Sequence, residues 1–237
     1  MMKKYLYACL LLFVSTMFFS SLSNAQVQWG VRAGMNMANS KFTQADGSVE
    51  ETDPVVRMQI GLTLDVPVWN NIYLQPSLIY QGKGFKGMGI WPALAEEDSE
   101  FKVNLSYLVM PIHVVFKPKL GSSGHLLVGA GPYIGYGLGG KWESESDLLY
   151  DDIMLAQRQG DVNFTKDGSV GEMGAYNYGE PWDYGIGFLL GYEFMERYSV
   201  QVNGDFGMAD LQYKYGDYDT GQELKNLTFG VSFGYKF

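Results

Sequence analysis

The feature that most constrains this fold is an alternation of apolar residues with small or polar ones. It is clearest in the last segment, from Leu227 to Phe237, where the odd positions are apolar or aromatic and the even positions are Thr, Gly, Ser or Lys. Successive side chains of a strand point to opposite faces, so this period of two predicts a strand with different surroundings on its two sides.

Eight segments follow this pattern, and each is long enough for a tilted membrane-spanning strand of about 9–11 residues. They cover residues 28–37, 56–66, 72–83, 107–117, 126–139, 182–194, 199–208 and 227–237. No segment after the N-terminal leader has 18 consecutive apolar residues, so any membrane span must be built from strands.

The N-terminus has the pattern of an export signal. Two lysines precede an apolar run from Tyr5 to about Phe19, and a small-residue cleavage site ends at Ala25. This order of charged, apolar and small residues is typical of a secretory signal peptide, and the run is short for a helical span of roughly 20 residues. We predict a cleaved signal peptide over residues 1–25 and a single outer membrane β-barrel domain over residues 26–237.

Composition limits the chemistry of the mature chain. The leader contains the only cysteine, so the mature chain has no disulfide and no cysteine metal site. Its formal net charge is two units more negative than the −9 of the whole chain, because Lys3 and Lys4 leave with the leader. This acidic balance argues against nucleic acid as a partner.

The connections between the predicted strands alternate in length. The short ones are 67–71, 118–124 and 195–197, and the long ones are 38–54, 85–101, 141–181 and 209–225. Outer membrane barrels place short turns on the periplasmic side and long loops outside the cell. A soluble barrel of the lipocalin type has no reason for this alternation, and it would expose the glycine-rich face of residues 126–139 to water.

Aromatic residues also gather near the predicted strand ends, as the girdles at two lipid interfaces require. We therefore predict an all-β fold, an eight-stranded antiparallel transmembrane β-barrel, located in the cell outer membrane.

Three motifs and the chain end resemble one family. They are LQPSLIYQGKG at residues 74–84, YLVMPI at 107–112, GAGPY at 129–133 and GVSFGYKF at 230–237. Together they resemble the PorT-type outer membrane β-barrel family of Bacteroidetes. The resemblance implies an outer membrane barrel, and some relatives are implicated in secretion and gliding machinery. The family commonly has Glu where this chain has Val109, so no role of that carboxylate carries over.

The inward charges are expected at three depths of the barrel. Asp65, Lys117, Glu193 and Lys236 lie near the periplasmic mouth, Arg57, Lys83, Asp183 and Asp205 near the outer mouth, and Arg32 and His113 near mid-depth. Desolvation costs several kcal/mol per ion, so these charges must pair, and eight strands leave an interior just wide enough for side chains. We predict a filled lumen, and a small passive pore for ions or small solutes stays the alternative.

No catalytic motif is evident. The two histidines, His113 and His125, have no Ser or Asp partner at an outer loop, and no nucleophile motif or metal cluster is present. Residues 217–221 match only part of a calcium-loop pattern, which favours a solvated turn. We predict a non-enzymatic protein without cofactor or metal.

The expected role is structural or interactive, as an accessory to secretion or envelope assembly. The predicted partners are outer membrane lipid, the barrel-assembly machinery and a protein of an envelope or secretion complex. The resemblance further implies that the terminal aromatics Phe233, Tyr235 and Phe237 are the signal that the assembly machinery reads.

Overall fold

The computed structural model describes residues 27–50, 52–88, 100–121, 124–145, 148–150, 153–155, 158–167, 175–214 and 220–237. The predicted signal peptide and most of the 217–221 turn lie outside these residues. The long strands are β1 (Gln28–Thr43), β3 (Val55–Trp69), β4 (Ile72–Met88), β5 (Glu100–Phe116), β7 (Gly124–Ser144), β12 (Trp182–Phe194), β13 (Tyr198–Gly207) and β14 (Glu223–Lys236). The short strands are β2 (Val49–Glu50), β6 (Lys119–Leu120), β8 (Leu148–Tyr150), β9 (Ile153–Leu155), β10 (Gln159–Phe164) and β11 (Tyr176–Tyr178).

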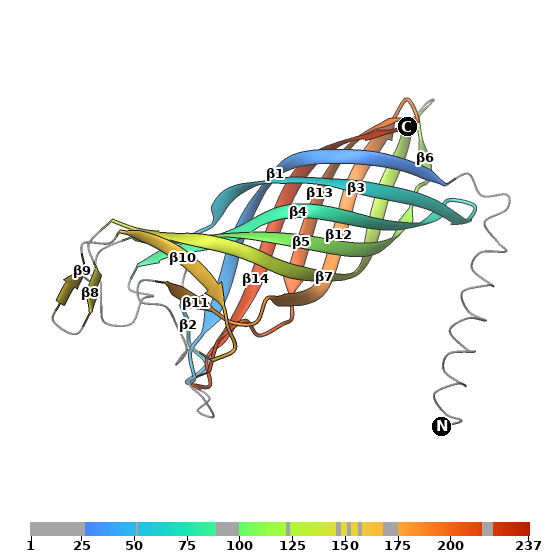
Figure 1. Cartoon of the computed structure of the whole chain (residues 1–237). Coiled ribbons are helices and arrows are strands. Elements are labelled where there is room, and N and C mark those ends of the chain that lie inside the picture. The colour runs from blue at the N-terminus through green and yellow to red at the C-terminus, as the bar shows by residue number, and fades with distance from the viewer. Residues whose placement is uncertain are drawn as a thin grey trace, which may run out of the picture.

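The long strands pair antiparallel into a closed ring in the order β1, β3, β4, β5, β7, β12, β13, β14. β14 returns to β1, with Val31 opposite Tyr235, so the last predicted segment pairs with the first and closes the barrel. Figure 1 shows the strands slanting around a barrel, with β8 to β11 at one end and the C-terminus at the other. Closure leaves no free edge in the ring, which a sheet inside a bilayer requires.

The faces of the barrel confirm the transmembrane fold class. On β3, Met58 and Ile60 point outward and are 74% and 60% exposed, while Gln59 between them points inward and is 2% exposed. A soluble barrel would show the reverse, because its apolar side chains would fill the interior. In the described part of the chain, no helix is long and apolar enough to cross a membrane.

The barrel has two unlike ends. We call the end with the short connections and the C-terminus the turn end, and the opposite end the loop end. At the loop end, β10 takes the place of β12 beside β7, with Val162 opposite Gly140. β11 pairs parallel with β10. The predicted connection 141–181 therefore contains part of β7 and strands of its own, because its apolar residues pack into the barrel mouth.

A change of register in β7 turns one side chain inward. The pairing with β5 shifts between Ser106 and Tyr107, opposite Gly139, whose φ is +140°. An inserted residue of this kind is a β-bulge, and glycine adopts the left-handed backbone readily. Beyond the bulge the facing of β7 reverses, so Trp142 is fully buried instead of facing outward.

The loop end encloses an apolar core, which we call the loop-end core. Its side chains come from β4, β5, β7, β10, β11, β14 and the segment after β13: Phe85, Phe101, Val103, Leu105, Tyr107, Val109, Tyr133, Trp142, Val162, Tyr176, Tyr178, Ala209, Leu211 and Leu224. This part of the barrel interior is packed like the core of a water-soluble protein, while the rest of the interior is mainly polar.

Three prolines interrupt the ladders of neighbouring strands, and we call them the proline seam. The pairing of β3 with β4 skips the residues beside Pro76, that of β4 with β5 skips Pro111, and that of β5 with β7 skips Pro132. Proline has no backbone N–H to donate, so a sheet loses ladder bonds where it occurs. The three motifs at 74–84, 107–112 and 129–133 thus meet along one line across the barrel wall.

Candidate functional site: the filled lumen

Four charges meet inside the turn end, and we call them the turn-end cluster. Asp65 on β3 forms ion pairs with Lys117, the residue directly after β5, and with Lys236 on β14. Glu193 on β12 pairs with Lys236 and lies 3.7 Å from Lys117. Each cation therefore contacts both anions. The structure brings together all four residues that the sequence placed near this mouth.

Neighbouring side chains complete the turn-end cluster. Gln75 donates a hydrogen bond from Nε2 to Asp65 Oδ1 at 2.7 Å. The Lys117 ammonium also lies 4.6 Å from the centre of the Tyr73 ring. Buried charges are tolerated when they are paired and hydrogen-bonded, and this arrangement crosses the lumen from β3 and β4 to β12.

The middle of the lumen is filled mainly by amides. Gln59 donates to Asn203 at 3.3 Å, and Gln81 donates to Asp205 at 3.1 Å. Arg32 lies 3.5 Å from the Gln201 side-chain oxygen. These bonds join β1, β3 and β4 to β13 across the barrel, so the interior is bridged by side chains at this depth.

His113 is sealed in this middle layer at 1% exposure. A Cβ built at Gly187 would lie 2.6 Å from His113 Nε2 and 3.0 Å from Asp205 Oδ1, so both side chains crowd that glycine. Among the described residues, neither ring nitrogen of His113 has a hydrogen-bond partner. The expected neighbour, Arg32, shares this depth without a direct hydrogen bond to His113.

The outer charges are arranged differently from the turn-end cluster. Lys83 donates to Asp183 at 2.6 Å, and both are fully buried. Asp183 also accepts from Asn226 at 3.0 Å and from the Tyr133 hydroxyl at 3.2 Å. The Lys83 ammonium lies 5.1 Å and 5.0 Å from the ring centres of Tyr107 and Tyr133. This pair is held in an aromatic enclosure.

The other two residues expected at the outer mouth do not join that pair. Arg57 donates to Asn104 at 3.3 Å, and Asp205 accepts from Gln81 in the layer below. From sequence these four charges were assigned to the same level of the lumen. The inward parity of a residue on its strand does not determine its depth along the barrel axis. The strand tilt and register, which do fix it, appear only in the folded barrel.

An aromatic cap covers the Lys83–Asp183 pair, and it consists of Val162, Phe164, Tyr176 and Tyr178 from β10 and β11. The Tyr178 hydroxyl donates to Asn226, which in turn donates to Asp183, so the cap is hydrogen-bonded to the buried ion pair. The Phe164 ring meets Tyr107 edge to face at 5.6 Å.

Sequence reasoning missed the loop-end core, to which Val162, Tyr176 and Tyr178 of the cap belong, although a signal was present. In residues 101–109 the apolar residues lie at odd positions, whereas in 108–116 the outward apolar residues lie at even positions. An apolar stretch on the inward parity indicates a dry interior at that height.

The terminal aromatics lie on the outer surface of the turn end. Phe233 and Phe237 are 50% and 57% exposed, and Phe237 stacks on Trp29 with ring centres 4.1 Å apart. The Phe237 backbone N–H also donates to the Trp29 carbonyl at 2.9 Å. In the described ranges, no group of three or more His, Cys, Asp or Glu is placed to hold a metal ion.

A closed barrel with an apolar outside and a charge-paired inside defines an integral outer-membrane-type protein. Residues 19–213 match the family described as the outer membrane protein beta-barrel domain, and the chain belongs to this family. No curated protein sequence matches the chain.

Several solved outer membrane proteins are similar in fold. OprG from Pseudomonas aeruginosa is 13% identical, with 89% of this chain and 95% of that chain covered and a TM-score of 0.48. The attachment invasion locus protein Ail of Yersinia pestis is 10% identical, with 89% and 98% covered and a TM-score of 0.38. The outer membrane protease OmpT from Escherichia coli is 10% identical, with 90% and 97% covered and a TM-score of 0.43. At these identities and scores the similarity does not extend to activity.

Proposed function

We propose that this protein is a closed, non-enzymatic outer membrane barrel whose loop end is an interaction surface. The observation that carries the proposal is the filling of the lumen in successive layers. The turn-end cluster, the amide layer, the Lys83–Asp183 pair and the aromatic cap follow one another along the barrel axis.

The energetics of these layers favour a plug over a conduit. An ion passing the turn-end cluster would have to separate Asp65 or Glu193 from two lysines at once. Breaking one buried ion pair costs about 3–5 kcal/mol, because it leaves an uncompensated charge. At the loop end the same ion would have to enter an apolar core, where a charge has no partner.

The orientation follows the rule for bacterial barrels, with short turns in the periplasm and long loops outside. On this basis we propose that the loop end faces outward. We also propose that the N-terminal leader, residues 1–25, exports the chain and is cleaved. The PorT-type resemblance supports a role as an accessory of a secretion or envelope-assembly complex, with a protein of that complex as the partner.

Planar-bilayer recording tests the plug. The purified barrel is expected to give no steady conductance, and Asp65→Asn is expected to give brief, irregular openings at most. Steady conductance of the unaltered protein, with an ion selectivity that Asp65→Asn or Glu193→Gln changes, would establish the passive pore instead.

Site-specific photo-crosslinking tests the interaction role. A photoreactive residue at Glu145, exposed at the loop end, is compared with one at Lys119, exposed at the turn end. We expect one defined envelope protein to be captured in intact cells from Glu145 and not from Lys119. Capture of no protein from the loop end would contradict the proposal.

A further inference from the structure

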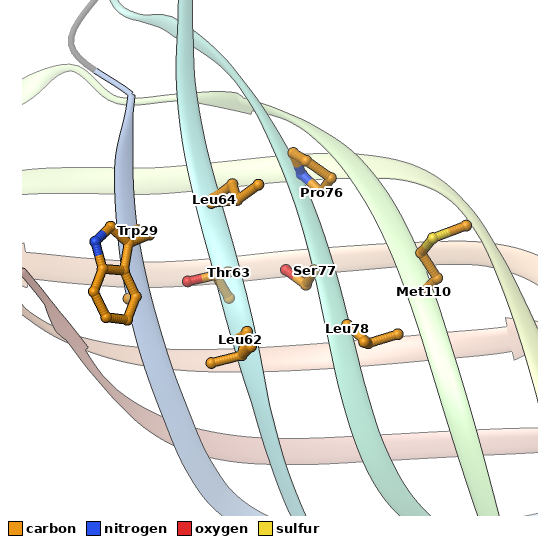
Figure 2. Close-up of a pocket in the computed structure, with 9 residues that line it drawn as sticks. Trp29, Leu62, Thr63, Leu64, Pro76, Ser77, Leu78 and Met110 are labelled. Atoms are coloured by element: carbon orange, nitrogen blue, oxygen red, sulfur yellow. The ribbon is translucent and has the colours of Figure 1, made fainter.

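The lipid-facing wall carries an apolar groove at the beginning of the proline seam. It has a volume of about 410 Å³ and crosses β1, β3, β4 and β5. Figure 2 shows the lining side chains on these four strands. The lining residues are Trp29, Gly30, Leu62, Thr63, Leu64, Pro76, Ser77, Leu78 and Met110.

The groove lies between two rows of outward side chains. One row contains Trp29, Leu64 and Pro76, and the other contains Leu62, Leu78 and Met110. The rows are two residues apart along each strand, which corresponds to about 6.6 Å. The residues between the two rows, Gly30, Thr63 and Ser77, belong to the inward face of their strands, so the backbone itself forms the floor.

The proline seam explains why the groove is at this place. The β3–β4 ladder goes from Thr63 opposite Ser77 directly to Val66 opposite Leu74, and Pro76 lies in the gap. The compact ring of Pro76 stands between Leu64 on β3 and Ile112 on β5 and contributes a low point to the wall. Because proline cannot donate, the gap also exposes one backbone donor fewer to lipid.

The surroundings of the groove determine what can occupy it. Ile60, Met58 and Met35 beside it are exposed and apolar, so the groove opens within the hydrocarbon-facing band. Trp29 stands at one end of the groove and stacks on Phe237 at the turn end. Tryptophan is enriched at the membrane–water interface, so this end of the groove lies at headgroup level and Met110 lies deeper.

We propose that this groove binds one acyl chain of a phospholipid, which enters beside Trp29 and runs toward Met110. The assignment to a phospholipid of the inner leaflet rests on the orientation proposed above. A second copy of this chain is the rival occupant. It fits less well, because a two-fold interface would require the same patch to supply both the groove and the ridge that fills it.

Native mass spectrometry of the detergent-purified barrel tests the proposal with 1-palmitoyl-2-oleoyl-phosphatidylethanolamine as the probe. Leu62→Trp fills the groove, and Ile60→Trp is its matched control on the same strand and the same outer face, outside the groove. We expect one retained lipid in the unaltered protein and in Ile60→Trp, and loss of that lipid in Leu62→Trp. Equal retention in both variants would overturn the groove as the site.

A second measurement covers the case in which Leu62→Trp fails to fold. Phospholipid brominated on the acyl chain is added in increasing mole fraction, and tryptophan fluorescence is measured in the unaltered protein, Trp29→Phe and Trp182→Phe. The difference between the unaltered protein and each variant gives the signal of the replaced tryptophan. We expect the Trp29 signal to be quenched at a lower brominated fraction than the Trp182 signal, since Trp182 faces lipid outside the groove. Equal quenching of the two tryptophan signals would contradict a lipid site in the groove. In the native mass spectra, a dimer peak that Leu62→Trp abolishes would assign the groove to a second copy of the chain. Neither readout depends on conductance, so failure here leaves the plug to be judged separately.

Discussion

Phe164 lies against Gly137, and a Cβ at that glycine would come within 2.3 Å of the Phe164 ring. The ring comes from β10 and the glycine from β7, so the connection after β7 folds back and wedges an aromatic side chain into the barrel wall. From sequence, the glycine-rich inner face indicates only a crowded interior. In the structure, Gly137 on this face leaves space for the Phe164 ring of the cap.

Gly137→Ala is expected to displace Phe164 and loosen the aromatic cap. Overpacking of this kind costs about 1–3 kcal/mol, because the neighbouring ring must move. Limited proteolysis of the intact barrel should show faster cleavage in the segment between β7 and β12. Gly135→Ala is the matched control, since its nearest contacts would be an ordinary 3.5 Å. Unchanged cleavage in Gly137→Ala would show that the wedge does not hold the cap.

The cap is expected to open in alkali. Burial raises the pKa of the Tyr176 and Tyr178 hydroxyls well above the ordinary tyrosine value. The folded cap therefore favours the neutral phenols, so the stability they contribute is present below about pH 10 and is lost as the pH rises further. Ultraviolet absorbance of tyrosinate and proteolysis should change together in this range. The double variant Tyr176→Phe, Tyr178→Phe should stay closed to higher pH, and an unchanged midpoint in that variant would contradict the assignment.

Asp183→Asn is expected to destabilise the barrel by about 3–5 kcal/mol, because Lys83 would keep a buried charge without its counter-charge. Urea unfolding in detergent micelles, followed by gel mobility of the folded and unfolded forms, measures this loss. Replacing both partners, as in Lys83→Met with Asp183→Leu, should recover much of it, since no charge is then left unpaired. A double variant whose loss of unfolding free energy equals the sum of two independent losses would argue that the two residues do not act as a pair.

Removal of Phe237 is expected to lower the amount of assembled barrel more than the stability of barrel that has already folded. The lost stacking with Trp29 is worth only about 0.5–1.5 kcal/mol, whereas a signal read during assembly acts on every chain. Membrane yield and urea unfolding of the extracted protein separate the two effects. Trp29→Leu is the control, because it removes the same ring contact and keeps the terminal aromatic. Normal yield without Phe237 would remove the assembly role.

The fold followed from sequence because the period of two is a local signal. Met58 and Gln59 face opposite ways in any strand, and which of them faces lipid was settled by the glycines and the lengths of the connections. The members of the turn-end cluster could also be predicted from sequence, since each lies near the end of a predicted strand at an inward-facing position.

The structure of the loop end could not be predicted by the same reasoning. Trp142 faces inward only because the bulge at Gly139 reverses the facing of β7, and a bulge is set by the register with the neighbouring strand. Asp205 and Lys83 share an inward facing but not a depth, because depth depends on how the strands are staggered around the ring. The proline seam likewise becomes visible only when three distant motifs are brought to neighbouring strands.

One hydrogen bond at the loop end has a consequence for protein engineering. The Ser144 N–H donates to the Arg158 carbonyl at 2.8 Å, so the chain leaves β7 and returns toward β10 through a closed neck. Residues inserted beyond that neck are tethered at two adjoining points of the loop end. A foreign peptide grafted between Glu145 and Arg158 would therefore be displayed beyond the loop-end core, with the lumen and its ion pairs left intact.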